Sequence, residues 1–156
     1  MLVKDVMTKN VIKFSMEDTI VKVLRTFSRK GISGAPVVKR GKLIGIITDS
    51  DIISNLDIYT PRIHFTSNPD FLLILAGLKT KRKASEIENE MKIMKKFKVK
   101  DFMTKRVFTI NENASISEAA RIMHEKEIKR LPVVNNKGKL VGIIARQDII
   151  KALAKI

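Results

Sequence analysis

The sequence lacks cysteine and tryptophan and contains one tyrosine and two histidines. Without cysteine, disulfides, thiolate catalysis and cysteine-ligated zinc or iron–sulfur sites are excluded. His64 and His124 stand in no metal-ligand spacing and beside no paired nucleophile. A glycine-rich phosphate loop is also missing, so nothing in the sequence supports ATP hydrolysis. We therefore expect a protein that is not an enzyme and that holds no catalytic cofactor or metal.

Long apolar runs are missing as well. The longest, Phe71–Leu78, has eight residues, whereas a helix that spans a bilayer needs about 20. Lys4 and Asp5 interrupt the N-terminal region before any apolar run forms, which does not match a signal peptide. These features predict a cytoplasmic protein without a membrane partner.

The charge is strongly basic. Lysine and arginine number 31 against 16 acidic residues, a net charge of +15, and residues 78–106 alone hold 11 basic and four acidic side chains. Such a charge predicts attraction to anions, whether nucleotide phosphates, nucleic acid or acidic proteins, without choosing among them. The shortage of tyrosine and tryptophan and the absence of a known nucleic-acid motif count against nucleic acid.

What the chain does contain is an internal repeat. Residues 3–40 align with 99–136 and, after a one-residue insertion, residues 41–56 align with 138–153; 24 of the 54 aligned positions are identical. Two copies are too few for a solenoid and instead predict a pseudo-symmetric pair. We therefore divide the chain into a first unit, 1–56, an inserted linker, 57–98, and a second unit, 99–156.

Each copy predicts the same order of elements: strand, helix, strand, strand, helix. The helix is amphipathic, and its predicted cap is Ser15 or Asp18 in the first copy and Asn113 or Ser115 in the second. Gly41 and Gly138 stand where a hairpin needs positive φ. The first strand is predicted at Val11–Phe14 or Val107–Ile110, and the second at Ala35–Val38 or Leu131–Val134. The third is predicted at Leu43–Ile47 and its copy, and the last helix at Asp51–Leu56 or Asp148–Leu153. The fold class is α+β with α/β-type packing, as two β-α-β-β-α units that share a core.

The linker predicts two helices that the repeat does not contain. Asn68 followed by Pro69 is typical of a helix start, and the apolar run up to Leu78 follows it. Ser85 and Glu88 match a capping box that opens the second helix. This helical, basic linker is the predicted output element, a packing patch or a dimer face.

Asp51 and Asp148 occupy the same place in both copies, just after a buried strand and in the first turn of a helix. Free backbone N–H groups at such a junction suit an anion or a sugar hydroxyl. The alternative is that each carboxylate only stabilises the start of its own helix.

Both copies share the pattern Met–Thr, apolar–Pro–Val–Val, and Gly–Lys–Leu–apolar–Gly–Ile–Ile–x–x–x–Asp. This pattern resembles a tandem pair of CBS (cystathionine β-synthase) domains, a Bateman module, over residues 1–56 and 99–156. The resemblance implies that the chain binds an adenosine-containing ligand: AMP, ADP, ATP, S-adenosylmethionine or methylthioadenosine. It also implies a homodimer of modules, a flat disc of four CBS units, that regulates an attached or a separate partner protein.

The same resemblance assigns roles to single residues. In the pattern Gly–apolar–apolar–Thr/Ser–x–x–Asp, Asp51 and Asp148 would bind ribose hydroxyls, and Thr48 would bind ribose or phosphate. The second copy departs from the pattern because Ala145 replaces the hydroxyl residue, and Arg146 would offset that loss if a phosphate lies within reach.

Two further groups complete the predicted site. Lys129 and Arg130 match basic positions that contact phosphate in the gamma subunit of AMP-activated kinase, and surface solubility is their alternative role. The predicted adenine wall comes from the first strand of each unit, Val11 and Ile12 or Phe108 and Thr109, and from Ala35 or Leu131. For the apolar residues among them a plain core role is equally open. Pro132, beside Leu131, is predicted to bind the ligand as well.

Three functions follow from these observations. The first is a regulatory sensor of an adenosyl ligand that signals to an unidentified partner protein. The second is nucleic-acid binding through the basic linker, which salt would weaken steeply. The third is a dimerisation scaffold that binds no ligand.

Overall fold

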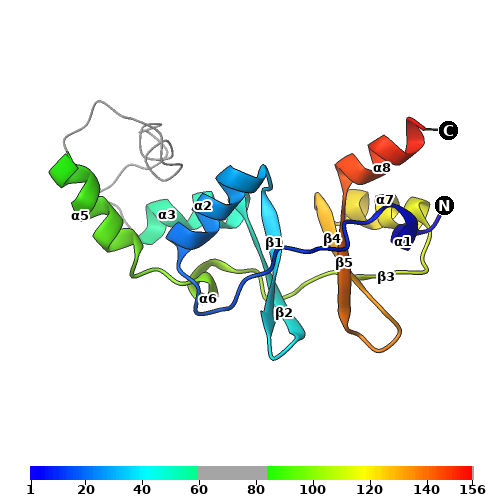
Figure 1. Ribbon diagram of the computed structural model, residues 1–156, viewed down its shortest axis with the longest axis horizontal. Coiled ribbons are helices and arrows are strands. Elements are labelled where there is room, and N and C mark those ends of the chain that lie inside the picture. The colour runs from blue at the N-terminus through cyan, green and yellow to red at the C-terminus, as the bar shows by residue number, and fades with distance from the viewer. Residues whose placement is uncertain (60–83, 156) are drawn as a thin grey trace. The chain divides into compact units, whose positions relative to one another are not determined.

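The computed structural model describes residues 1–59 and 84–155 (Figure 1). The chain divides into two compact units, which we name by the repeat that supplies most of each. The second-repeat unit consists of Met1–Lys13, Val38–Ile44 and Arg106–Ile156, and the first-repeat unit consists of Phe14–Val37 and Gly45–Lys105. Each unit thus contains a segment of the other repeat.

The second repeat forms a three-stranded sheet in the order β3-β4-β5. β3 (Ile110–Asn111) runs parallel to β4 (Arg130–Val134), and β4 pairs antiparallel with β5 (Leu140–Ala145). α7 (Ile116–Glu125) connects β3 to β4, and α8 (Arg146–Leu153) follows β5 directly. The predicted β-α-β-β-α order and the α+β class are confirmed.

From its amphipathic helix onward, the first repeat has the same order of elements. α2 (Ile20–Lys30) precedes β1 (Gly34–Lys39) and β2 (Lys42–Thr48), which form a two-stranded sheet, and α3 (Asp49–Tyr59) follows. The second linker helix is confirmed as α5 (Ala84–Met94), although it begins one residue before the predicted cap Ser85. The linker helix predicted after Asn68 lies outside the described residues.

The N-terminal segment of each repeat packs in the unit of the other repeat. α1 (Val3–Val6) belongs to the second-repeat unit, beside α8 and β5 (Figure 1), and Val3 is fully buried in that unit's core. The rest of this core comes from the second repeat: Ile110, Ala119, Met123, Leu131, Val133, Ile144 and Ile149. α6 (Val99–Phe102) belongs to the first-repeat unit, where Val99 is equally buried.

Backbone hydrogen bonds hold both exchanged segments in the same way. The N–H groups of Thr8 and Ile143 each donate to the other's carbonyl, at 2.9 and 3.0 Å, and Thr104 and Ile46 form the equivalent pair at 2.9 Å in both directions. Lys100 also donates to Glu17 at 2.9 Å. This bond lowers the pKa of Glu17 and raises the pKa of Lys100. The repeat pattern Met–Thr therefore marks a contact with the other repeat's strand.

The glycines of the Gly–Ile–Ile motif make this contact close. A Cβ at Gly45 would lie 2.9 Å from Met103 Sδ and 3.0 Å from the Thr104 carbonyl oxygen. At Gly142 it would meet Met7 Sδ and, at 3.1 Å, the Thr8 carbonyl oxygen. Only glycine lets the exchanged segment come this near the strand.

The first strand of each repeat is shorter than predicted. Instead of Val11–Phe14 there is one parallel bridge between Phe14 and Val37, and instead of Val107–Ile110 there is the two-residue β3. Pro36 explains the difference in the first repeat. Its carbonyl accepts from the Phe14 N–H at 3.0 Å. Proline has no N–H to donate back to the first strand, so the hydrogen-bond ladder between the two segments cannot continue there. Pro132 occupies the same position in the second repeat.

One of the two helix caps was predicted correctly. Ser115 caps α7 by accepting from the Glu118 N–H at 3.1 Å. In the first repeat, the cap of α2 is Thr19 rather than Ser15 or Asp18. Asp18 is engaged elsewhere, because its carboxylate accepts from the Ser15 N–H at 2.8 Å and from Lys22 Nζ at 2.7 Å.

Candidate functional site

The junction between β2 and α3 in the first-repeat unit holds Thr48 and Asp51 in a reciprocal capping arrangement. The Thr48 N–H and hydroxyl donate to Asp51 Oδ2 at 2.9 and 2.7 Å, and Thr48 Oγ1 accepts from the Asp51 N–H at 3.1 Å. Both side chains are half-buried. The carboxylate therefore stabilises its own helix start, which is one of the two roles weighed from the sequence.

The second oxygen of Asp51 is also engaged. Thr104, on the exchanged segment that contains α6, donates its hydroxyl to Asp51 Oδ1 at 2.9 Å. Three donors thus satisfy this carboxylate within its own unit. A ribose hydroxyl at Asp51 would compete with the hydroxyls already there.

The equivalent junction between β5 and α8 is less occupied. The Ala145 N–H donates to Asp148 Oδ2 at 2.8 Å, and within the described residues this is the hydrogen bond of the Asp148 side chain. Alanine supplies no hydroxyl, and the hydroxyl of Thr8, the counterpart of Thr104, makes no such bond to Asp148. The Asp148 carboxylate thus keeps more capacity to accept from a ligand than Asp51 does.

Basic residues of the prediction lie at the same end of this sheet. Arg130, half-buried, begins β4 and stands opposite Ala145 in the strand register. Lys129, exposed, accepts at its carbonyl from the Arg146 N–H at 3.0 Å. The guanidinium of Arg146 donates to the Ile128 and Met123 carbonyls at 3.1 and 3.3 Å. The Arg146 side chain therefore caps carbonyl groups at and just after the C-terminal end of α7, and Arg146 is two residues from Asp148 in the sequence.

The predicted adenine-wall residues divide between the units. Ile12, Thr109, Leu131 and Pro132 belong to the second-repeat unit, and Ala35 belongs to the first-repeat unit. Leu131 and Ala35 are fully buried and pack in the core. Ile12 is half-buried, and Thr109 is exposed.

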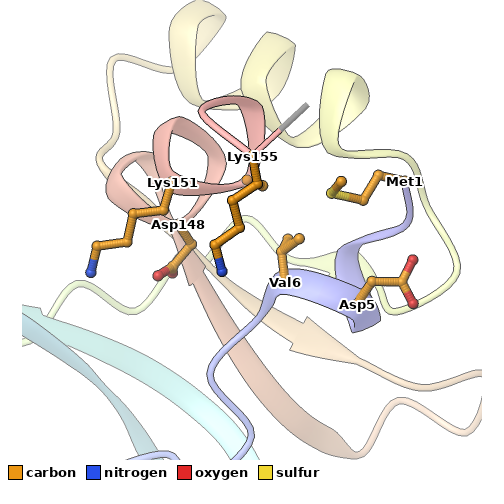
Figure 2. Close-up of a pocket in the computed structure, with 7 residues that line it drawn as sticks. Met1, Asp5, Val6, Asp148, Lys151 and Lys155 are labelled. Atoms are coloured by element: carbon orange, nitrogen blue, oxygen red, sulfur yellow. The ribbon is translucent and has the colours of Figure 1, made fainter.

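A cavity of about 540 Å³ lies between α1 and α8 in the second-repeat unit. Figure 2 shows Asp148 in it, together with Lys151 of α8 and Lys155 from the turn after that helix. Val6 and Ala152 contribute apolar surface. The volume falls within the usual range of small-molecule sites. Asp148 is therefore the predicted site residue that lines this cavity.

Sequence reasoning missed Lys151, Lys155 and Thr104. The two lysines follow Asp148 at helical spacings of three and seven residues, a pattern that indicates a shared helix face. Thr104 stood in the repeated Met–Thr pair, but nothing local to that pair pointed to Asp51.

Other kinds of site receive no support from the described residues. Within residues 1–59 and 84–155 there is no group of three or more acidic or histidine side chains that could hold a metal ion. None of the helices in these ranges combines the length and the apolar character that a membrane crossing requires.

Comparison with protein families gives a match to the CBS domain at two places, residues 3–58 and 99–155. Uncharacterized protein MJ1426 of Methanocaldococcus jannaschii is 40% identical over 154 residues, which cover 98% of this chain and 91% of that protein. The inosine-5'-monophosphate dehydrogenase of the same organism is 31% identical over 148 residues, but these make up only 22% of the enzyme.

Solved structures show the same architecture. One is the CBS domain pair of protein MJ0100 in complex with 5'-methylthioadenosine and S-adenosyl-L-methionine, with a TM-score of 0.70 at 24% identity. The match covers 99% of this chain and 97% of that structure's chain. CBSX2 of Arabidopsis thaliana, in complex with AMP, has a TM-score of 0.69 at 24% identity, with 99% and 96% covered. At this identity the likeness establishes the fold.

Proposed function

This chain belongs to the CBS-domain family, and on that premise we propose that it is a regulatory module that binds an adenosine-containing ligand. The ligand class is AMP, ADP, ATP, S-adenosylmethionine or methylthioadenosine. The module acts without catalysis, by favouring one arrangement of its parts when the ligand binds, and it signals to a partner protein. A ligand shifts such an equilibrium only as far as its affinities for the two arrangements differ.

The observation that carries the proposal is the carboxylate at the strand–helix junction of both repeats. Asp51 and Asp148 sit in the first turns of α3 and α8, each held by the backbone N–H three residues earlier, at 2.9 and 2.8 Å. A fixed carboxylate beside a helix N-terminus suits a sugar diol next to a phosphate. The relatives MJ0100 and CBSX2, which carry adenosine-containing ligands in their crystals, add support.

Of the two junctions, the one at Asp148 is the better placed to bind. Its carboxylate has the larger free acceptor capacity, and Lys129 and Arg130 stand at the same end of the sheet. At Asp51 the ligand must displace or share the hydroxyl of Thr104. We therefore expect unequal affinities at the two sites.

The proposed partner for assembly is a second copy of this chain. Ile53 on α3 and Ile150 on α8 occupy equivalent repeat positions and are 46% and 59% exposed, and Leu153 is 52% exposed. Ile150 and Leu153 are neighbours on one helix face. Large exposed apolar side chains that recur at matching positions favour a symmetric interface.

Calorimetric titration of the protein, freed of carried-over nucleotide, tests the proposal with the five ligands named above. We expect binding by at least one ligand, and the variant Asp148→Ala should weaken it because the ribose loses its acceptor. Asp101→Ala is the matched control. That variant removes a capping carboxylate that accepts from the Lys98 N–H at 2.9 Å, but it lies at the start of α6 rather than at a junction.

If none of the five ligands binds, the proposal is contradicted. The dimerisation scaffold would then be the better account of the chain, unless a nucleic acid binds with steep dependence on salt. Equal losses in Asp148→Ala and Asp101→Ala would remove Asp148 from the site.

A further inference from the structure

Resting on the proposed function, we infer that the ligand of the second-repeat unit is a nucleoside 5'-diphosphate or triphosphate whose phosphates bind Lys151 and Lys155. The place is the cavity of about 540 Å³ between α1 and α8. Neither lysine belongs to the repeat's shared motif. Within the proposed ligand class, ADP and ATP are therefore the ligands expected at the site in the second-repeat unit.

The three charged side chains come from α8 and from the turn that follows it. Asp148 and Lys151 of α8 and Lys155 just after it all line the cavity (Figure 2). Asp148 and Lys151 are separated by about 4.5 Å along the helix axis, at a rise of 1.5 Å per residue, and Lys155 follows two residues after the last helical residue, Leu153. This order suits a ribose at Asp148, a first phosphate at Lys151 and later phosphates at Lys155.

The other cavity groups are compatible with an anion. Asp5 is the second carboxylate of the lining, but it caps α1 by accepting from the Leu2 N–H at 2.9 Å, and Figure 2 shows it directed away from the lysines. Val6 and Ala152 give the apolar contact that the sugar needs. Neither lysine forms an ion pair with a described carboxylate within 4.0 Å, so their charges are available to phosphate.

The sequence of the first repeat has no counterpart of these two lysines. Continuing the repeat alignment, Ser54 and Ile58 stand where the second repeat has Lys151 and Lys155. In addition, the Thr104 hydroxyl occupies Asp51 Oδ1. The polyphosphate subsite is therefore specific to the second-repeat unit.

Titrations of ATP, ADP, AMP, S-adenosylmethionine and methylthioadenosine into the double variant Lys151→Gln/Lys155→Gln test the inference. We expect affinity in wild type to rise from AMP to ATP. The variant should lose about tenfold or more for ATP, as expected when charge-assisted hydrogen bonds are removed, and keep its affinity for methylthioadenosine. Lys137→Gln/Lys139→Gln, two exposed hairpin lysines of the same unit, is the control for net charge.

The possible failures are distinct. If ATP binds but the two double variants lose equally, the attraction is general electrostatics and the subsite is wrong. If the Lys151/Lys155 variant loses S-adenosylmethionine and not ATP, the lysines hold a carboxylate rather than phosphates, and the inference is again overturned. If no adenosine-containing ligand binds the wild-type protein, the proposed function fails together with it.

Discussion

At the scale of single residues, the two repeats differ most at their matching carboxylates. Asp51 accepts from two hydroxyls and one N–H, whereas Asp148 accepts from one N–H of the described chain. One substitution and one difference in contact account for this. Ala145 replaces Thr48, and Thr8 does not reach its carboxylate as Thr104 does. Both repeats therefore have the carboxylate, but the two carboxylates differ in how many hydrogen bonds they can still accept from a ligand.

Thr104→Val should destabilise the protein by about 0.5–1.5 kcal/mol, the usual net value of one hydrogen bond. Valine keeps the shape of the side chain but removes the donor to Asp51. Thr8→Val is the matched control, because Thr8 has the same backbone pairing and no bond to Asp148. Urea unfolding of both variants measures the difference. Equal effects would show that the Thr104 hydroxyl bond contributes nothing to stability.

At the scale of elements, the segment with each repeat's first helical turn packs against a strand of the other repeat. Two reciprocal hydrogen bonds, a buried valine and a methionine against a strand glycine recur on both sides. The motif Met–Thr and the motif Gly–Ile–Ile are the two halves of one contact. Glycine in these strands thus serves packing between elements rather than a turn.

Gly45→Ala should cost about 1–3 kcal/mol, because the added Cβ forces Met103 and the Thr104 backbone to move. The double variant Gly45→Ala/Met103→Ala should recover part of the loss, since it removes the side-chain clash but leaves the carbonyl at 3.0 Å. Denaturant midpoints of wild type, both single variants and the double variant complete the cycle. A Gly45→Ala protein as stable as wild type would contradict the close approach.

At the scale of the whole molecule, the proposed dimer interface and the proposed ligand site involve different residues of α8. Asp148, Lys151 and Lys155 line the cavity, while Ile150 and Leu153 are exposed apolar neighbours outside its lining. A homodimer and a bound ligand are therefore compatible on this helix. A change in the position of α8 would carry information from one to the other.

Ile150→Lys/Leu153→Lys should convert the proposed dimer to a monomer, since two charges would be buried in the interface. Ser117→Lys/Ala120→Lys, exposed on α7 at the same spacing, is the control for added charge. Light scattering coupled to size-exclusion chromatography measures the mass. A wild-type protein that is already monomeric at high concentration would refute the dimer.

Local interactions explain why much of this fold was predictable from the sequence. The repeat predicted the order of elements, and Gly41 and Gly138 do have positive φ, 76° and 72°. Ser115 as a cap followed from its neighbours three residues on. The predicted cap Asp18 was wrong because its carboxylate accepts from Ser15 and Lys22 instead. The first strand was predicted too long because Pro36 has no N–H to donate to it.

The sequence by itself determined the family, the two junction carboxylates and the order of strands and helices, because these depend on motifs and contacts a few residues apart. Only the tertiary structure decided that α1 and α6 each pack in the unit of the other repeat. The same holds for the hydrogen bond between Thr104 and Asp51, 53 residues apart, and for the cavity that Lys151 and Lys155 share with Asp148. Such contacts depend on how buried faces match after folding, and no local pattern encodes that match.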